Sequence, residues 1–152
     1  MIKLNSSAPL AEDAGKLLLR VVAGGLMFLQ HGVPKLTKFD ELMYTFPDPI
    51  GLGPAFALTL IVLAEIVFAL LVVLGVWTRL STIPLIIGMA VAVFVAHGDD
   101  ILGKGETGLI YMAAFIAILL IGGGRFSLDR IAIGRTTKPA RISVGQQIVE
   151  HA

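Results

Sequence analysis

Four stretches of the chain are apolar over about the length that a helix needs to cross a membrane. They are residues 14–33, 54–77, 80–97 and 107–124, each close to the roughly 20 residues that span about 30 Å of hydrocarbon. Because lipid offers no partners for backbone N–H and C=O groups, such segments must bond internally, which favours helices. We therefore predict an all-α fold, a bundle of four transmembrane helices.

The remaining residues leave room for a single membrane domain. The chain has 152 residues, of which 56% are hydrophobic and 15% charged. We assign residues 14–131 to the membrane domain, residues 1–13 to an N-terminal cytoplasmic segment and residues 132–152 to a cytoplasmic tail. The first apolar stretch is followed by His-Gly-Val-Pro rather than by a small-x-small cleavage site, so we expect it to be retained and not removed as a signal peptide.

Lysine and arginine are distributed unequally between the two ends of the predicted bundle. Four helices place both termini on one face, and that face then carries nine of the twelve basic residues: Lys3, Lys16, Arg20, Arg79, Arg125, Arg130, Arg135, Lys138 and Arg141. The opposite face carries Lys35, Lys38 and Lys104. Basic residues concentrate on the cytoplasmic side of membrane proteins. We therefore expect both termini in the cytoplasm and the chain in the bacterial cytoplasmic (inner) membrane.

Two charged side chains lie well inside the apolar stretches, beyond Lys16 near the start of the first one, and need partners. Glu65 stands near the middle of the second stretch, where a charge facing lipid would cost about 3 kcal/mol even on the lenient insertion scale. Arg20 stands in the first stretch, and its long side chain, directed outward, would approach the level of Glu65. We predict a buried Arg20–Glu65 ion pair, which either fixes the packing of the helices or takes part in a proton relay or ligand binding.

Polar side chains also gather at the predicted outer end of the bundle. His31 and His97 lie at similar heights, Tyr111 lies about one turn inside the fourth helix, and Lys35 and Glu106 lie at the border. We predict that these five residues line an outward-facing pocket. A quinone carbonyl, a metal ion or a haem would suit such side chains, whereas in the simplest alternative each histidine only ends its helix near water. The sequence lacks a local ligand spacing such as H-x-x-x-H, so we predict no metal site.

The nine residues FLQHGVPKL, residues 28–36, are interpreted as the point where the first helix leaves the bilayer. Proline lacks an N–H group and its ring clashes with the preceding helical turn, so we expect Pro34 to discourage continuation of the helix. Lys35 would then reach the interface with its ammonium group. His31 would be the last side chain directed inward.

The chain contains no cysteine. It can therefore form neither a disulfide nor a dithiol relay by itself, and a cysteine-ligated zinc or iron–sulfur centre is excluded. Any redox cofactor, such as a quinone, would be borrowed rather than covalently held. We expect the lipid bilayer to be one partner and no nucleic acid to be another.

Three longer stretches share a pattern of glycines and charged residues. They are LLLRVVAGGLMFLQHGVPKL, LAEIVFALLVVLGVWTRLSTIPL and GETGLIYMAAFIAILLIGGGRFSLDRI, with a predicted helix ending in AHG between the last two. Together, over about residues 16–131, they resemble the DoxX family of small four-helix membrane proteins. Where many members have Gly-Pro-Gly-Arg, this chain has Gly-Gly-Gly-Arg at residues 122–125.

The resemblance implies a membrane role but defines no enzymatic activity for the chain itself. Related proteins are membrane subunits of thiosulfate:quinone oxidoreductases and of assemblies that join oxidant-defence and sulfur-transfer enzymes. Our first hypothesis is therefore an inner-membrane subunit of a redox-associated assembly that interacts with a quinone and with another membrane or peripheral redox protein. The alternatives are a non-catalytic scaffold or assembly chaperone, which some distant relatives resemble, and a small proton-coupled transporter. A homo-oligomer is compatible with each.

Overall fold

A computed structural model of the chain describes residues 11–49 and 51–130, and all the regular elements in these ranges are helical. The first long helix comprises α1 (Glu12–Leu26), a π-helical segment η1 (Met27–Gly32) and α2 (Val33–Thr37), and it is followed by the short α3 (Phe39–Leu42). The second comprises α4 (Pro54–Leu63), the π-helical η2 (Ala64–Phe68) and α5 (Ala69–Leu74). The third comprises α6 (Thr78–Ala90) and the π-helical η3 (Val91–Ala96), and the fourth is α7 (Glu106–Ile121).

Three of these helices are long and apolar enough to cross a membrane. They run over Glu12–Thr37, Pro54–Leu74 and Thr78–Ala96, with 26, 21 and 19 residues. The fourth, α7, is also apolar but has only 16 residues. It ends three residues before the predicted boundary because Gly122 adopts a φ of 75°, in the left-handed region that does not continue a right-handed helix. The all-α prediction is confirmed for the described residues.

The first helix does not end at Pro34, and that prediction is wrong. The helix continues through α2 to Thr37. In a regular α-helix the proline ring clashes with the carbonyl four residues earlier. Here Pro34 is the second residue of α2, and the residue four positions earlier lies in η1, where the wider i→i+5 pattern of a π-helix changes the position of the carbonyls. Lys35 therefore remains on the helix, one turn beyond His31.

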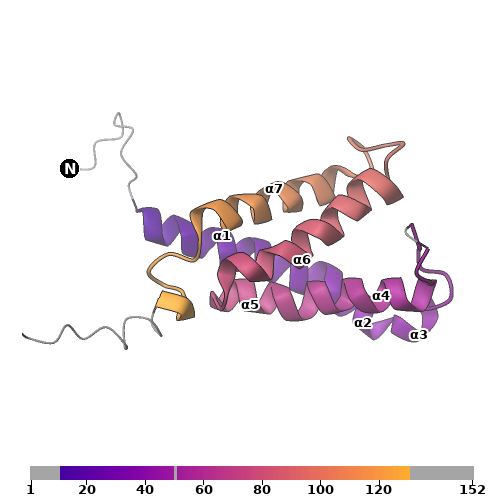
Figure 1. Cartoon of the computed structure of the whole chain (residues 1–152), viewed down its shortest axis with the longest axis horizontal. Helices are drawn as coiled ribbons and strands as arrows, with labels where there is room; N and C mark the ends of the chain where they lie inside the picture. The colour runs from indigo at the N-terminus through magenta and orange to yellow at the C-terminus, as the bar shows by residue number, and fades with distance from the viewer. Residues whose placement is uncertain (1–10, 50, 131–152) are drawn as a thin grey trace, which may run out of the picture.

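Both ends of the described chain lie at the same end of the bundle (Figure 1). This end carries the start of α1, the turn between α5 and α6 and the end of α7. We call it the basic end, after Lys16, Arg79, Arg125 and Arg130. The short α3, the residues 43–49 and 51–53 that follow it and the loop at residues 97–105 lie at the opposite end. Within the bundle, α1 packs along α5 and α6 packs along α7.

Small residues let the first two long helices approach closely. A Cβ atom added to Gly24 would lie 2.8 Å from Cγ2 of Val73, and one added to Gly32 would lie 2.9 Å from the carbonyl oxygen of Glu65. Such contacts allow helix backbones to come together where a larger side chain would separate them. The approach at Gly32 sets the distance between η1 and the carboxylate-bearing η2.

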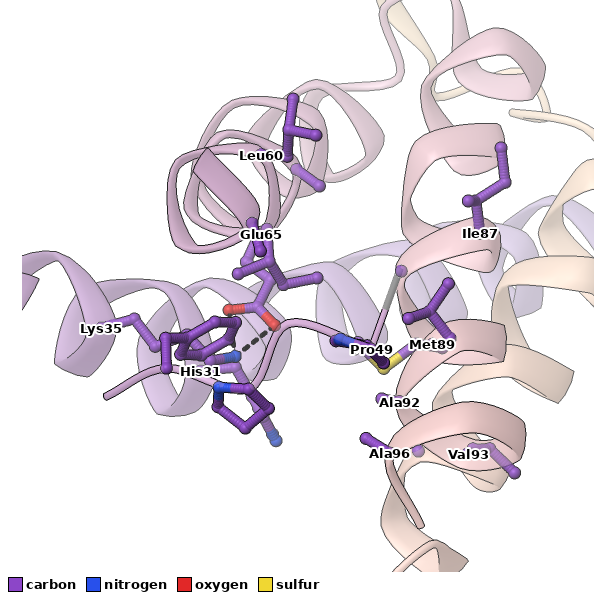
Figure 2. Close-up of a pocket in the computed structure, with 18 of the residues that line it drawn as sticks. His31, Lys35, Pro49, Leu60, Glu65, Ile87, Met89, Ala92, Val93 and Ala96 are labelled. Carbon is purple, nitrogen blue, oxygen red and sulfur yellow. Dashed lines mark hydrogen bonds and ion pairs between the residues drawn. The ribbon is translucent and has the colours of Figure 1, made fainter. Parts of the chain in front are cut away.

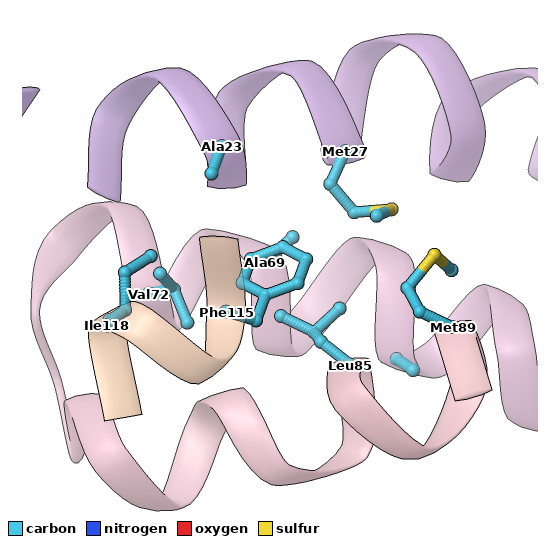
Figure 3. Close-up of a cluster of buried hydrophobic side chains, with 9 residues drawn as sticks. Ala23, Met27, Ala69, Val72, Leu85, Met89, Phe115 and Ile118 are labelled. Atoms are coloured by element: carbon cyan, nitrogen blue, oxygen red, sulfur yellow. The ribbon is translucent and has the colours of Figure 1, made fainter. Parts of the chain in front are cut away.

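The apolar core lies between all four long helices (Figure 3). Met27 meets Met89 near Leu85 and Phe115, and all four side chains are buried. Many large apolar side chains on the outside of the bundle are exposed, as expected for surfaces that face lipid rather than water. The core thus fixes the four helices around one another, and the polar groups described next lie beside it.

Candidate ligand-binding cavity

Glu65 and Lys35 form an ion pair inside the bundle (Figure 2). The Nζ atom of Lys35 lies 2.5 Å from Oε1 and 2.6 Å from Oε2 of Glu65. The Glu65 side chain is fully buried, whereas 24% of the Lys35 side chain is exposed. A buried carboxylate is tolerated only when it is paired and hydrogen-bonded. Lys35 supplies both the charge and the hydrogen bonds.

Arg20 is also fully buried, but it does not pair with Glu65. Its guanidinium group donates to the carbonyl oxygens of Val72 at 3.3 Å, Val73 at 3.4 Å and Phe126 at 3.0 Å. Val72 and Val73 belong to the last turn of α5, where carbonyls lack helical partners and the helix dipole favours a cation. Since Glu65 lies about 10 Å further up the same helix, the predicted Arg20–Glu65 pair is wrong, although the burial of both residues is confirmed.

His31 lies beside this ion pair in η1. Its ring meets the ring of Tyr111 from α7 edge to face, with centroids 5.1 Å apart and an interplanar angle of 80°. Tyr111 in turn stacks on Phe115, with centroids 6.3 Å apart. Aromatic pairs prefer such edge-on and offset arrangements. The orientation of His31 is therefore set by a column of rings that begins in the core.

These polar groups lie at one side of a cavity of about 820 Å³. Its other walls are largely apolar: Leu60 of α4 lies on the same long helix as Glu65, and Ile87 of α6 and Ala96 of η3 lie across the cavity (Figure 2). Residues 46–49 of the loop before α4 close part of it. Ligand pockets of proteins typically have about 300–1,000 Å³, with mostly apolar walls and a few placed polar groups. The cavity has the size and the composition of such a site.

Three of the five residues predicted to line a pocket do line this cavity, namely His31, Lys35 and His97. Tyr111 lies behind His31 and is not part of the wall. Glu106 is exposed at the start of α7 and does not line the cavity either. The structure therefore brings His31, Lys35 and His97 to one cavity, to which the fourth helix contributes Thr107 and Gly108 instead of Glu106 and Tyr111.

The position of Glu65 on the cavity wall was not predicted from the sequence. Glu65 lines the cavity together with Lys35, whereas it was predicted to lie beneath the pocket with Arg20. Asp48 and Lys104 also line the cavity and were not predicted. The carboxylate of Asp48 accepts hydrogen bonds from the backbone N–H groups of Leu52 at 2.9 Å and Gly53 at 2.6 Å, which folds the loop that closes the cavity.

All three π-helical segments lie at this site. His31 belongs to η1 and Glu65 to η2, and η3 supplies Val93 and Ala96 to the wall. Single π-helical turns within α-helices are rare and frequently occur at functional sites. Three π-helical segments around one cavity therefore indicate a functional site. The spacing of apolar residues in the sequence does not predict such segments.

The apolar helices and the buried ion pair define the class of the protein, a helical integral membrane protein that crosses the bilayer several times. The sequence model of the DoxX family matches residues 15–98, more than half of the chain. The chain belongs to the DoxX family, and it is a multi-pass protein of the inner membrane.

The chain aligns with most of the length of several relatives, and the names of these relatives state no activity. The chain is 33% identical to an uncharacterised membrane protein of Mycobacterium tuberculosis over 128 residues, covering 74% of this chain and 78% of the relative. It is 32% identical to an uncharacterised protein of Haemophilus influenzae, covering 68% and 74%. It is 29% identical to the inner membrane protein YphA of Escherichia coli, covering 75% and 88%. No solved structure matches the chain significantly.

Proposed function

We propose that the chain is a quinone-binding subunit of a redox-associated assembly in the inner membrane. The observation that carries this proposal is the Lys35–Glu65 ion pair beside His31, on the wall of an apolar cavity of about 820 Å³. The apolar walls suit an isoprenoid tail, and the polar side suits the carbonyl oxygens of a quinone ring. Electrons would come from a partner protein, because the chain has no cysteine for an iron–sulfur centre.

Lys35 is the group that would contact the quinone carbonyl. A lysine ammonium has three N–H donors, and its two contacts with the oxygens of Glu65 leave at least one donor for a ligand. The pair with Glu65 holds the ammonium in place, so little side-chain freedom is lost when the ligand binds. His31 provides a second polar group on the same wall, held by its contact with Tyr111.

The proposal includes four membrane crossings with both termini in the cytoplasm. Two observations support this topology. Both ends of the described chain lie at the basic end (Figure 1), and basic residues mark the cytoplasmic side. The 16 residues of α7 cover about 24 Å, and the residues around its two ends would complete the crossing.

A titration tests the function. The full-length protein is placed in lipid nanodiscs and titrated with short-chain ubiquinone and menaquinone analogues, with binding followed by calorimetry. We expect saturable binding, and loss of about tenfold or more in affinity in the Lys35→Met variant, which removes a hydrogen bond from a charged donor. The matched control is Lys38→Met, because Lys38 is exposed and does not line the cavity. Absence of binding to the wild-type protein, or equal binding by Lys35→Met, contradicts the proposal.

A further inference from the structure

A second cavity lies at the basic end, about 1040 Å³ in volume. It is formed by the start of α1, the turn before α6 and the segment after α7. Four basic side chains line it, Lys16, Arg79, Arg125 and Arg130, together with two acidic ones, Asp13 and Asp129. The ligand-binding cavity described above contains none of these residues. The two sites are therefore separate.

Both acidic side chains are engaged in holding the fold. Asp129 accepts hydrogen bonds from the backbone N–H groups of Trp77 at 2.7 Å and Thr78 at 3.0 Å, and from the Thr78 hydroxyl at 3.1 Å. Asp13 accepts one from the backbone N–H of Arg125 at 2.9 Å. These carboxylates stabilise the start of α6 and the segment after α7, and the four basic side chains that line the cavity outnumber them.

Two guanidinium groups at this cavity have no carboxylate partner among residues 11–49 and 51–130. Lys16 forms an ion pair with Glu12, and Arg125 lies 3.9 Å from Asp13. Arg79 and Arg130 form no such pair within the described ranges. The guanidinium of Arg79 lies over Gly122, where an added Cβ would be 3.5 Å from Nε, and it donates to the carbonyl of Leu120 at 3.4 Å. An excess of positive charge is therefore present in the cavity.

The outer wall of this cavity is apolar. It consists of Trp77, Leu80 and Ile121, and Trp77 is 69% exposed. Trp77 has a φ of 43°, in the left-handed region that non-glycine residues rarely adopt, and the hydrogen bond to Asp129 holds its backbone there. Tryptophan is enriched at the boundary between lipid and water. The cavity thus combines basic side chains with exposed apolar ones of the kind found at a membrane boundary.

We infer that this cavity binds the phosphate headgroup of an anionic glycerophospholipid, with Arg79 and Arg130 at the phosphate and Trp77, Leu80 and Ile121 along the acyl chains. Guanidinium groups match phosphate oxygens in geometry and charge, and basic pockets on the cytoplasmic side of membrane helices bind anionic headgroups. The apolar wall favours a lipid over a free anion, because a soluble phosphate would gain nothing from it. The inference does not depend on quinone binding.

The single tryptophan of the chain provides the measurement. Trp77 lines the cavity, so energy transfer from Trp77 to pyrene-labelled lipid reports binding directly. The full-length protein is placed in phosphatidylcholine nanodiscs and titrated with pyrene-phosphatidylglycerol or pyrene-phosphatidylcholine. We expect preferential transfer to phosphatidylglycerol, and a loss of about tenfold or more in that preference in the double variant Arg79→Gln/Arg130→Gln, from about fivefold for each cation near the surface.

Matched variants keep the test decisive. Lys38→Gln removes an exposed basic residue of the opposite end that lines neither cavity, and it should leave the preference unchanged. Arg79→Lys/Arg130→Lys keeps the charge and should retain most of the preference. The single variants Arg79→Gln and Arg130→Gln, each expected to lose about fivefold, replace the double variant if that variant fails to fold. Equal transfer to both lipids in the wild-type protein overturns the inference. Displacement of pyrene-phosphatidylglycerol by inorganic phosphate as readily as by unlabelled phosphatidylglycerol also overturns it, in favour of a soluble anion.

Discussion

Lys35 and Glu65 meet inside the bundle although 30 residues separate them in the chain, with the ammonium nitrogen 2.5 and 2.6 Å from the two carboxylate oxygens. The meeting depends on two local features of the first helix. The helix continues past Pro34, which carries Lys35 to the level of η2, and Gly32 brings the backbones together.

The two halves of the ion pair should respond unequally to substitution. Lys35→Met leaves the fully buried Glu65 without its partner, and breaking a buried pair in this way costs about 3–5 kcal/mol. Glu65→Gln should cost less, because the Lys35 side chain is 24% exposed and can move toward the outside. The double variant Lys35→Met/Glu65→Gln should cost less than the sum of the single changes. Reversible unfolding in mixed micelles measures all three, and strict additivity would show that the two groups do not interact.

Close packing at Gly32 should be required for the site. In Gly32→Ala the new methyl group would lie 2.9 Å from the carbonyl oxygen of Glu65 and 2.8 Å from Cδ1 of Ile66, so the helices must separate. We expect a loss of stability of about 1–3 kcal/mol and weaker quinone binding. The control is Gly25→Ala on the same helix, where nothing lies within 4 Å of the added atom. Equal behaviour of the two variants would contradict the packing described here.

Arg20 should act as a clamp and not as part of the site. Its guanidinium joins the end of α5 to Phe126 through three carbonyl oxygens. In Arg20→Lys a single ammonium replaces the planar group and cannot maintain the same set of contacts. We expect a loss of about 1–3 kcal/mol in unfolding free energy, with quinone affinity unchanged in the folded fraction. If the affinity falls while stability does not, Arg20 belongs to the site after all.

Gly75 should be as sensitive as Arg20. Its φ is 73°, and a Cβ atom there would overlap the guanidinium group of Arg20, so alanine meets both backbone strain and a clash. Gly15→Ala is the matched control, since Gly15 lies in α1 with no atom within 4 Å of the added Cβ. Because alanine is the better helix former by about 1 kcal/mol, Gly15→Ala should be neutral or stabilising. Thermal unfolding distinguishes the two variants, and a stable Gly75→Ala protein would argue against the clamp.

The two aromatic neighbours at the cavity should differ in effect. His31 lines the cavity, and Tyr111 supports it from behind without lining it. We expect His31→Ala to weaken quinone binding by about tenfold. Tyr111→Phe retains the ring that holds His31 and should bind quinone like the wild-type protein. Calorimetric titration of both variants checks this, and a comparable loss in Tyr111→Phe would restore Tyr111 to the binding wall.

The sequence predicted the elements better than the contacts between them. Four apolar stretches are a direct consequence of solvation by lipid, so the helices could be located to within a few residues. The side-chain partners could not, because they depend on where each helix ends. Lys35 was predicted to reach the interface and to line the pocket, and Arg20 was taken as the partner of Glu65 because its long side chain would approach the level of Glu65. The π-helical turn that accommodates Pro34 has no signal in apolar periodicity.

Glu106 shows a second limit of sequence reasoning. Its height along the chain suggested a place beside His31 and His97, but height does not determine the direction in which a side chain points. Glu106 is the first residue of α7 and is exposed there, where a carboxylate is stabilised by the helix dipole. His97 lies at a similar height and does line the cavity. Whether a side chain at this height lines the cavity depends on the rotation of its helix about the helix axis. For α7, the packing of Phe115 and Ile118 in the core sets this rotation.

Photolabelling with a quinone tests the central claim most directly. A diazirine-bearing ubiquinone analogue is irradiated with the full-length protein in nanodiscs, and the labelled residues are mapped by mass spectrometry. We expect labels on the cavity walls, in α4 and η3 near Leu60 and Ala96, and their loss in Lys35→Met/Glu65→Gln. Labels confined to lipid-facing residues such as Leu18 and Leu120, unchanged in the double variant, would contradict the account.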